Sequence, residues 1–184
     1  TRNGLNRMSL RRGGVQIMRI FHDPQDRSSL PGNFISVIHS DSHGKLWISA
    51  LGGGLCKMLT GRDGKFKPTF HWTSTESGLL NGDKETLLED EKGRFWLGGH
   101  GLTRYDPEED EFKYYDVSDG LQSNSFKVWA AYKNRNGEMI FGGTAGFNIF
   151  HPDSITDNKA IPKLAFTELK IFNHSLKAGR KFRG

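Results

Sequence analysis

The sequence predicts an all-β protein: a partial β-propeller of about three to four blades, each a four-stranded antiparallel sheet. A nine-residue pattern, Asp41–Ser49, recurs at 90–98 and, with an asparagine first, at 134–142. A glycine followed by an apolar residue comes after each copy, at Gly54, Gly101 and Gly146, with an earlier copy at Gly4. These glycines are 50, 47 and 45 residues apart. A period of this length with several short strands per repeat is typical of propeller blades.

Each repeat divides into the same elements. A short apolar inner strand leads into Asp-x-x-Gly, which favours a type I turn with aspartate at the first position and glycine at the fourth. A buried second strand, a third strand opened by the Gly-apolar pair, and a polar, aromatic outer strand follow. We expect inner strands at 35–38 and 86–88, second strands at 46–48 and 95–97, third strands at 55–59, 102–106 and 147–150, and outer strands at 66–72 and 112–116.

The repeats at the two ends are incomplete. Residues 4–12 and 15–22 supply the last two strands of an earlier blade, and residues 124–150 supply three strands of a fourth. Closed propellers have about four to eight blades. We therefore expect residues 1–152 to be a fragment of a larger propeller. The fourth blade also departs from the pattern, with Asn134 in place of aspartate and Ile140 in place of tryptophan. Its missing outer strand could come from a distant N-terminal segment.

The tail carries no further copy of the repeat. Residues 153–163 form a polar linker, and Leu164–Asn173 alternates apolar and polar residues as a strand does. A different domain is therefore expected to begin near residue 162.

Residues that repeat at a fixed blade position are interpreted as packing residues. Trp47 and Trp96 are expected to pack between sheets. The glycines at 98, 99 and 101 lie between strands with no helix after them, so the dinucleotide-binding fingerprint is not met. The single cysteine, Cys56, excludes an internal disulfide framework and a cysteine-based zinc site, and is expected to be a small buried hydrophobe.

Composition and charge narrow the function classes. The longest apolar runs, such as 128–132, are far too short to cross a bilayer. The basic excess lies at residues 1–30 and 159–184 while the middle is net acidic, which argues against nucleic-acid binding. Seven histidines are scattered, so we predict no metal site and no cofactor. Acidic runs fall in predicted turns, and no catalytic motif is recognised.

The repeated Asp-x-x-Gly-x-(Leu/Phe)-Trp pattern with its Gly-Leu partner resembles the two-component regulator propeller repeat. Residues 120–126 and 137–152 resemble the last blade of that array, and residues 161–173 resemble the first strand of the immunoglobulin-like domain that follows it. The resemblance implies a periplasmic sensor segment of a hybrid two-component receptor. Residues 164–184 would then be the first part of an immunoglobulin-like domain. It also implies a homodimer in the intact receptor, the remaining blades as partners, and an oligosaccharide as ligand. Histidine kinase activity would belong to parts of the parent outside this chain.

Propeller ligands commonly bind at loops on one face near the axis, so the segment leading into the fourth inner strand is the candidate site. It offers polar and aromatic groups for a sugar, and two residues beside the third strand of the preceding blade extend the set. The candidate ligand-binding residues are Asn124, Ser125, Phe126, Lys127, Trp129, His100 and Arg104. The alternative is that Phe126 and Trp129 pack between blades. Two other functions stay open: a propeller lyase or glycosidase acting on carbohydrate, and a protein-interaction scaffold.

Overall fold

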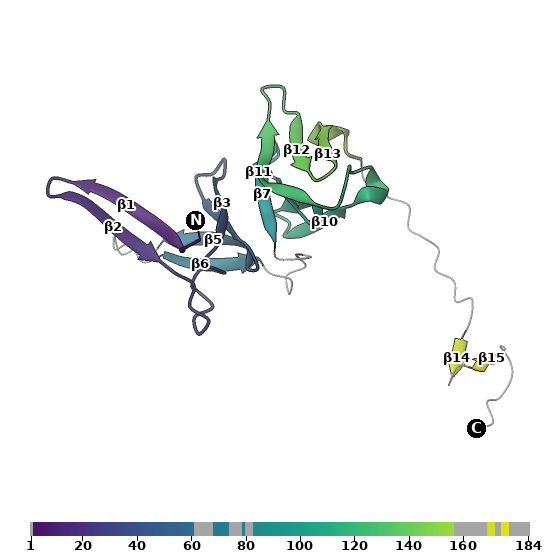
Figure 1. The fold of residues 1–184 in the computed structure, drawn as a ribbon, viewed down its shortest axis with the longest axis horizontal. Coiled ribbons are helices and arrows are strands. Elements are labelled where there is room, and N and C mark those ends of the chain that lie inside the picture. The colour runs from purple at the N-terminus through teal and green to yellow at the C-terminus, as the bar shows by residue number, and fades with distance from the viewer. Residues whose placement is uncertain are drawn as a thin grey trace.

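A computed structural model describes residues 2–60, 68–73, 79, 83–156, 169–171 and 174–176. This part of the chain is almost entirely β-structure, arranged as successive antiparallel sheets (Figure 1). None of its helices is long and apolar enough to cross a membrane.

The sheets follow the order of the repeats, and we number them as blades 1 to 4. Blade 1 is a two-stranded hairpin, blades 2 and 3 are four-stranded, and blade 4 has three strands in the described residues. Their strands are β1 (Leu5–Arg11) and β2 (Gly14–Ile20); β3 (Ile35–Ser40), β4 (Leu46–Ala50), β5 (Gly54–Thr60) and β6 (Pro68–Thr73); β7 (Lys84–Glu89), β8 (Phe95–Gly99), β9 (Gly101–Asp106) and β10 (Glu111–Tyr115); β11 (Phe126–Lys133), β12 (Met139–Gly143) and β13 (Gly146–Phe150). The predicted four-stranded antiparallel sheets are confirmed. The expected start of an outer strand at residue 66 lies outside the described residues.

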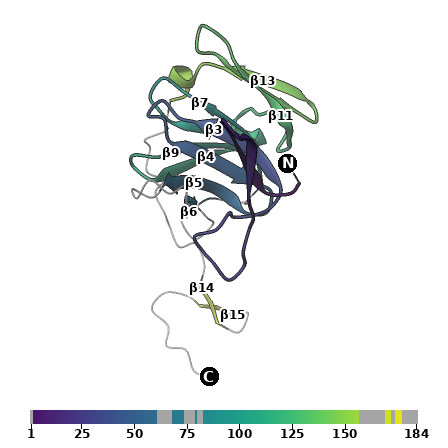
Figure 2. The same cartoon turned by 90° about the vertical axis from the view of Figure 1, so that its left-hand side faces the viewer.

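The inner strands of successive blades are neighbours in space. β3 contacts β7, and β7 contacts β11, so these three strands form the inner side of the assembly (Figure 2). The outer strands β6 and β10 lie at the far edge of their sheets. This radial order, with the first strand of each blade innermost, is the order expected of propeller blades.

The aspartate of the repeated turn holds the turn and the tryptophan together. In blade 2, Oδ1 of Asp41 accepts hydrogen bonds from the backbone N–H groups of His43 and Lys45, at 3.0 and 2.8 Å. Its Oδ2 accepts one from Nε1 of Trp47 at 2.9 Å. In blade 3, Asp90 repeats the arrangement and accepts from Nε1 of Trp96 at 3.0 Å. The pattern therefore pairs aspartate with tryptophan because one carboxylate oxygen serves the backbone and the other serves the indole.

Blade 4 shows what happens when the tryptophan is absent. Oδ1 of Asn134 still accepts from the backbone N–H groups of Asn136 and Glu138, at 2.9 and 3.0 Å. Its Nδ2 donates to Oε2 of Glu138 at 2.7 Å. With Ile140 in the tryptophan position there is no indole N–H to satisfy, so an amide serves where the other blades need a carboxylate.

The glycine of the Gly-apolar pair is required by the outer strand beside it. A Cβ at Gly54 would lie 3.1 Å from the carbonyl oxygen of Thr73, and one at Gly101 would lie 2.7 Å from that of Tyr115. At Gly146 in blade 4 the same position has nothing within 4 Å. The glycine thus lies close to a carbonyl oxygen in the blades whose outer strand is described. In blade 4, where no outer strand is described, it does not.

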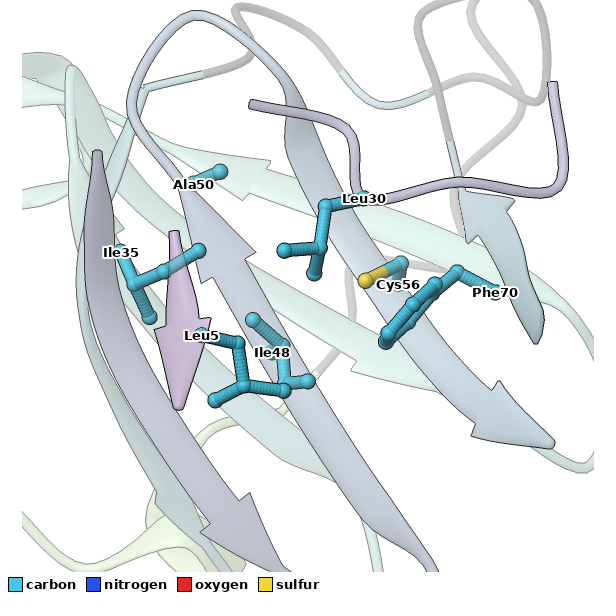
Figure 3. Close-up of a cluster of buried hydrophobic side chains, with 7 residues drawn as sticks. All are labelled: Leu5, Leu30, Ile35, Ile48, Ala50, Cys56 and Phe70. Atoms are coloured by element: carbon cyan, nitrogen blue, oxygen red, sulfur yellow. The ribbon is translucent and has the colours of Figure 1, made fainter. Parts of the chain in front are cut away.

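Three clusters of buried hydrophobic side chains fill the seams between blades. The cluster between blades 1 and 2 contains Leu5, Ile35, Ile48 and Cys56 (Figure 3). Cys56 is fully buried, as expected, and burial raises the pKa of its thiol to about 12.

The two tryptophans of the repeat pack across the other two seams. Trp47 of blade 2 lies against Phe95 and Tyr105 of blade 3, with ring centroids 5.0 and 6.0 Å apart. Trp96 of blade 3 meets Phe150 of blade 4 at 4.9 Å. The expected packing of Trp47 and Trp96 between sheets is confirmed.

The tail is described only in part. β13 is followed by a short 3-10 helix, Pro152–Ser154, and the next described segments are β14 (Leu169–Ile171) and β15 (His174–Leu176), which pair antiparallel. Most of the strand expected at Leu164–Asn173, and the linker before it, lies outside the described residues. The boundaries at 152, 163 and 164 and the immunoglobulin-like domain stay predictions.

Candidate ligand site at the axial bulges

Each inner strand contains a β-bulge near its start. In blade 2 the pairing passes from Ile35–Ala50 to Val37–Ser49, which leaves Ser36 as the extra residue. In blade 3 it passes from Lys84–Gly99 to Thr86–Gly98, which leaves Glu85. Bulges bend a strand and redirect side chains, and they are often found beside functional sites.

The bulge of blade 4 is larger than the other two. The pairing passes from Phe126–Gly143 to Ala131–Phe141, so residues 127–130 lie opposite Gly142 alone. The sequence carries a trace of this enlargement: eight positions separate Asn33 from Asp41, whereas ten separate Asn124 from Asn134. The bulge is enlarged in blade 4 alone among these three blades, and the fold does not require the extra residues. The enlarged bulge is therefore a candidate functional feature.

Trp129 lies at the centre of this enlarged bulge. Its φ of 61° is in the left-handed region, which costs a non-glycine residue of order 1–3 kcal/mol and is concentrated at functional sites. Its side chain is 79% exposed, and its Nε1 donates a 3.0 Å hydrogen bond to the carbonyl oxygen of Ser36. The bulge residue of blade 4 therefore reaches the bulge residue of blade 2 while leaving most of its aromatic surface open.

The remaining polar groups at this level come from the same bulges. Glu85 is the bulge residue of β7, the strand that contacts both β3 and β11, and is partly buried. Lys127 is exposed in the enlarged bulge. We call Ser36, Glu85, Lys127 and Trp129 the axial cluster. It combines an aromatic surface, a carboxylate and an ammonium, which are the groups that recognise a polar ligand with an apolar face.

A buried lysine fixes the bulge of blade 2 against blade 3. Lys84 is fully buried, and its carbonyl oxygen accepts from the hydroxyls of Ser36 and Ser49 at 2.7 and 2.9 Å. Its Nζ donates to Oγ1 of Thr103 at 2.9 Å and lies 5.8 Å from the ring centre of Tyr114. Burial lowers the pKa of Lys84 to about 8, although the charge of Asp83 acts in the opposite direction. These contacts hold the acceptor of the Trp129 hydrogen bond in place.

The candidate residues taken from the sequence do not all meet at one place. Lys127 and Trp129 belong to the axial cluster. His100 is exposed and forms an isolated bridge with Ser125, at the start of the blade 4 inner strand. Arg104 lies in the middle of β9, paired in register with Trp96 and Lys113, and is not part of the bulge.

Asn124, another of the candidate residues, has a structural role. Oδ1 of Asn124 accepts from the backbone N–H of Val117 at 3.0 Å, and its carbonyl oxygen accepts from Gly101 at 2.9 Å. Asn33 makes the same two contacts two repeats earlier, with His22 and Gly4. Asn124 is therefore a clamp between successive blades.

Phe126 packs in the core. It is 1% exposed and lies edge-on to Phe141 at 6.1 Å. It shares a buried cluster with Trp96 and Leu102 of blade 3, so its ring packs at the seam between blades 3 and 4, and its part in ligand binding stays a prediction.

Sequence reasoning missed Ser36, Glu85 and Lys84. The unequal spacing between the two repeated motifs marks the enlarged bulge, but nothing in the sequence indicates which carbonyl group Trp129 reaches. No group of three or more metal-ligating side chains is found among the described residues.

Residues 29–52 match the family model for the two-component regulator propeller. The match covers the segment before β3, the bulge residue Ser36, the Asp41 turn and β4. The chain contains a two-component regulator propeller repeat. The chain is also 32% identical over 104 residues to histidine kinase P4 of Formosa agariphila. That alignment covers 56% of this chain and 8% of the relative, so the chain spans a small part of that protein.

Solved structures give a looser likeness. The extracellular domain of the hybrid two-component system BT3049 from B. thetaiotaomicron is 21% identical, with a TM-score of 0.48 over 89% of this chain and 30% of that chain. The extracellular domain of the BT4673 system from the same organism is 21% identical, with a TM-score of 0.34 over 81% of this chain and 20% of that chain.

Proposed function

We propose that this chain is part of the extracytoplasmic sensor of a hybrid two-component receptor. It binds an oligosaccharide and passes the signal to a kinase domain elsewhere in the parent protein. The regulator propeller repeat and the similarity to a histidine kinase support the receptor assignment. A periplasmic location, an immunoglobulin-like domain after residue 163 and a homodimeric receptor belong to the same proposal.

The observation that carries the ligand site is the exposed indole of Trp129, whose backbone is in the left-handed region at the enlarged bulge. Packing within the described blades does not account for it, because the side chain is mostly solvent-exposed. Sugars offer apolar ring faces edged by hydroxyls. The open indole offers a stacking surface, and the bulges of β7 and β11 supply an acceptor in Glu85 and a donor in Lys127.

The same residue gives a route from binding to signalling. A ligand changes a conformational equilibrium only if it binds one state better than the other. The Trp129–Ser36 hydrogen bond joins blade 4 to blade 2 across blade 3. A ligand that stacks on the indole would favour one arrangement of the inner strands over another.

The test is a thermal-shift screen of the intact ectodomain against oligosaccharides, with chromatography of each mixture. A ligand at a hundred times its Kd raises the free energy of unfolding by about 2.7 kcal/mol. We expect Trp129→Ala to weaken binding at least tenfold. Trp129→Phe keeps an aromatic face and loses the Ser36 hydrogen bond, so it should retain more affinity than the alanine variant.

The outcomes separate the candidate functions. A shifted midpoint with the sugar recovered intact supports the sensor. Cleavage of the sugar would instead indicate a lyase or glycosidase. No response to any sugar, together with binding of a protein partner, would indicate an interaction scaffold. Unchanged ligand affinity in Trp129→Ala would remove the axial cluster from the site.

A further inference from the structure

A second hollow lies away from the axial cluster, along the seam between blades 2 and 3. A cavity of about 240 Å³ opens between the strands β5 and β6 of blade 2 and the β9–β10 turn of blade 3. A narrower cavity of about 50 Å³ continues from it toward the Asp41 turn. Both are lined by Trp47, Lys57 and Pro107, so they form one continuous groove, which we call the seam groove.

The wider part of the groove has the size of a small molecule. At about 30 Å³ per water in the liquid, its 240 Å³ corresponds to roughly eight water-sized groups. This is the scale of a small organic acid or a single sugar ring. The narrower part has room for one compact group at the end of such a molecule.

Lys45 and Lys57 both line the narrower part, and Lys57 lines the wider part as well. Nζ of Lys57 lies 5.5 Å from the ring centre of Trp47, which holds the side chain along the wall of the groove. Within the described chain, neither lysine forms an ion pair with a carboxylate.

Three carboxylates line the narrow part, those of Asp41, Glu89 and Glu108, and the first two are already engaged elsewhere. Both oxygens of Asp41 accept hydrogen bonds from its own turn and from the Trp47 indole. Both oxygens of Glu89 accept from the backbone N–H of Ser42, and Oε2 also contacts Nε2 of His39 at 2.8 Å. Lys92 lines the same part but donates to Oδ1 of Asp153 at 2.6 Å, so the ammonium groups left over there are those of Lys45 and Lys57.

Lys57 is influenced more by the charge of Lys45 than by that of Asp41. Burial lowers the pKa of Lys57, and the neighbouring charge of Lys45 lowers it further. The opposing effect of Asp41 is smaller than either. An anion placed between the two ammonium groups would remove this repulsion and would gain charge-assisted hydrogen bonds.

We propose that the seam groove is a binding site for a small anionic ligand, whose carboxylate, phosphate or sulfate group is held by Lys45 and Lys57 while its body occupies the wider cavity. Trp47 forms the wall on which Lys57 rests, and Pro107 of blade 3 closes the opposite side. The site draws on two blades, so a bound anion links them. It does not depend on the axial cluster or on the proposed sensor function.

The test is isothermal titration of the intact protein with glucuronate, sulfate and phosphate, and with glucose as the neutral match for glucuronate. We expect saturable binding of glucuronate or of one of the inorganic anions, no binding of glucose at this site, and an affinity that falls as sodium chloride is added. If glucuronate binds and sulfate and phosphate do not, the ligand is a carboxylate attached to a larger body. If sulfate or phosphate binds and glucuronate does not, the ligand is an inorganic anion or carries a sulfate or phosphate ester.

Variants locate the binding. Lys57→Met removes the ammonium but keeps a side chain that packs on Trp47, and should weaken anion binding about tenfold or more. Lys57→Arg should restore most of it. Lys113 also rests on an aromatic ring, with Nζ 5.4 Å from the ring centre of Tyr115, but lies outside the groove. Lys113→Met is therefore the matched control and should bind as the unmodified protein does.

Two results would overturn the proposal. One is the absence of saturable binding by all three anions. The other is unchanged affinity in Lys57→Met under conditions where its thermal midpoint matches that of Lys113→Met. Because Trp129→Ala leaves the seam groove intact, loss of oligosaccharide binding in that variant and loss of anion binding in Lys57→Met are separate outcomes.

Discussion

At the scale of single residues, the repeat is a set of hydrogen-bonding requirements. Aspartate is needed where a tryptophan N–H must be satisfied, as at Asp90 and Trp96. Asparagine suffices at position 134, where isoleucine takes the tryptophan's place. The weakened fourth copy of the motif is thus a coupled replacement of two residues.

This coupling makes Asp90→Asn a sharp test. The side chain of Asp90 is almost fully buried, and Oδ2 accepts from Nε1 of Trp96 and Nε of Arg94, at 3.0 and 2.8 Å. An amide that keeps the backbone contacts would turn its own N–H groups toward these two donors. We expect a loss of about 3 kcal/mol in the free energy of unfolding, measured by urea denaturation of the intact protein. Asn134→Asp has no indole beside it, but it would bring a carboxylate against Glu138, so it is compared in a Glu138→Gln background, where it should cost under about 1 kcal/mol. Equal losses in the two variants would contradict the coupling.

The same carboxylate sets an acid limit on stability. Burial raises the pKa of Asp90, but hydrogen bonds from Trp96, Arg94 and Lys92 outweigh it, so the pKa lies below its ordinary value of 3.8. The unfolded chain therefore binds the proton more readily. The stabilisation is present above pH 3.8 and is lost as the pH falls through the lower folded value. Asp90→Asn should accordingly lose less stability than the unmodified protein between pH 5 and pH 3.

Residue roles near the axis were predictable only in part. Alternation along the fourth inner strand does not show which side chains are buried, because the bulge between Phe126 and Ala131 interrupts the pairing with β12. The clamp role of Asn124 is recognisable from Asn33 only once the hydrogen bonds are known. The burial of Lys84 had no trace in composition, since a lysine at a strand start normally lies at the surface.

At the scale of elements, the sequence predicts the blades well because each strand and turn is specified locally. Apolar runs bounded by Asp-x-x-Gly and Gly-apolar pairs place every strand of blades 2 and 3 within a few residues of its observed bounds. Bulges escape such reasoning because they depend on which residues pair across two strands. The enlarged bulge of blade 4 is the element on which the proposed function depends, and its register was the part least accessible from sequence.

The turn glycines provide the test at this scale. Gly44 and Gly101 both have a φ of 73°, so alanine at either position is strained by about 1–2 kcal/mol. A Cβ at Gly44 meets nothing within 4 Å, whereas one at Gly101 lies 2.7 Å from the carbonyl oxygen of Tyr115. We expect Gly101→Ala to cost about 1–3 kcal/mol more than Gly44→Ala, because the outer strand must shift. Comparing the thermal midpoints of the two variants in the intact protein checks this, and equal midpoints would show that the outer strand is free to move.

At the scale of the whole molecule, the seams between blades are filled but the two ends of the array are open. In blade 3, Leu88 and Leu102 pack against blade 4. The matching residues of blade 4, Tyr132 and Phe147, are 61% and 63% exposed. On the blade 1 hairpin, Leu10 is 78% exposed. The faces that other blades cover inside the array are therefore bare at its ends, which supports the proposal that more blades of the parent protein complete it.

These open faces predict the behaviour of residues 1–156 produced alone. Exposed apolar faces and unpaired strand edges favour association between copies. We expect concentration-dependent oligomers in size-exclusion chromatography with light scattering. Phe147→Lys with Ile149→Glu places charge on the open face of blade 4 and should shift the distribution toward monomer. Ser118→Lys, on the exposed 3-10 helix Val117–Asp119, is the control and should leave it unchanged. A monodisperse monomer with a cooperative melt would show instead that the blades are self-sufficient and that the bare faces need no partner.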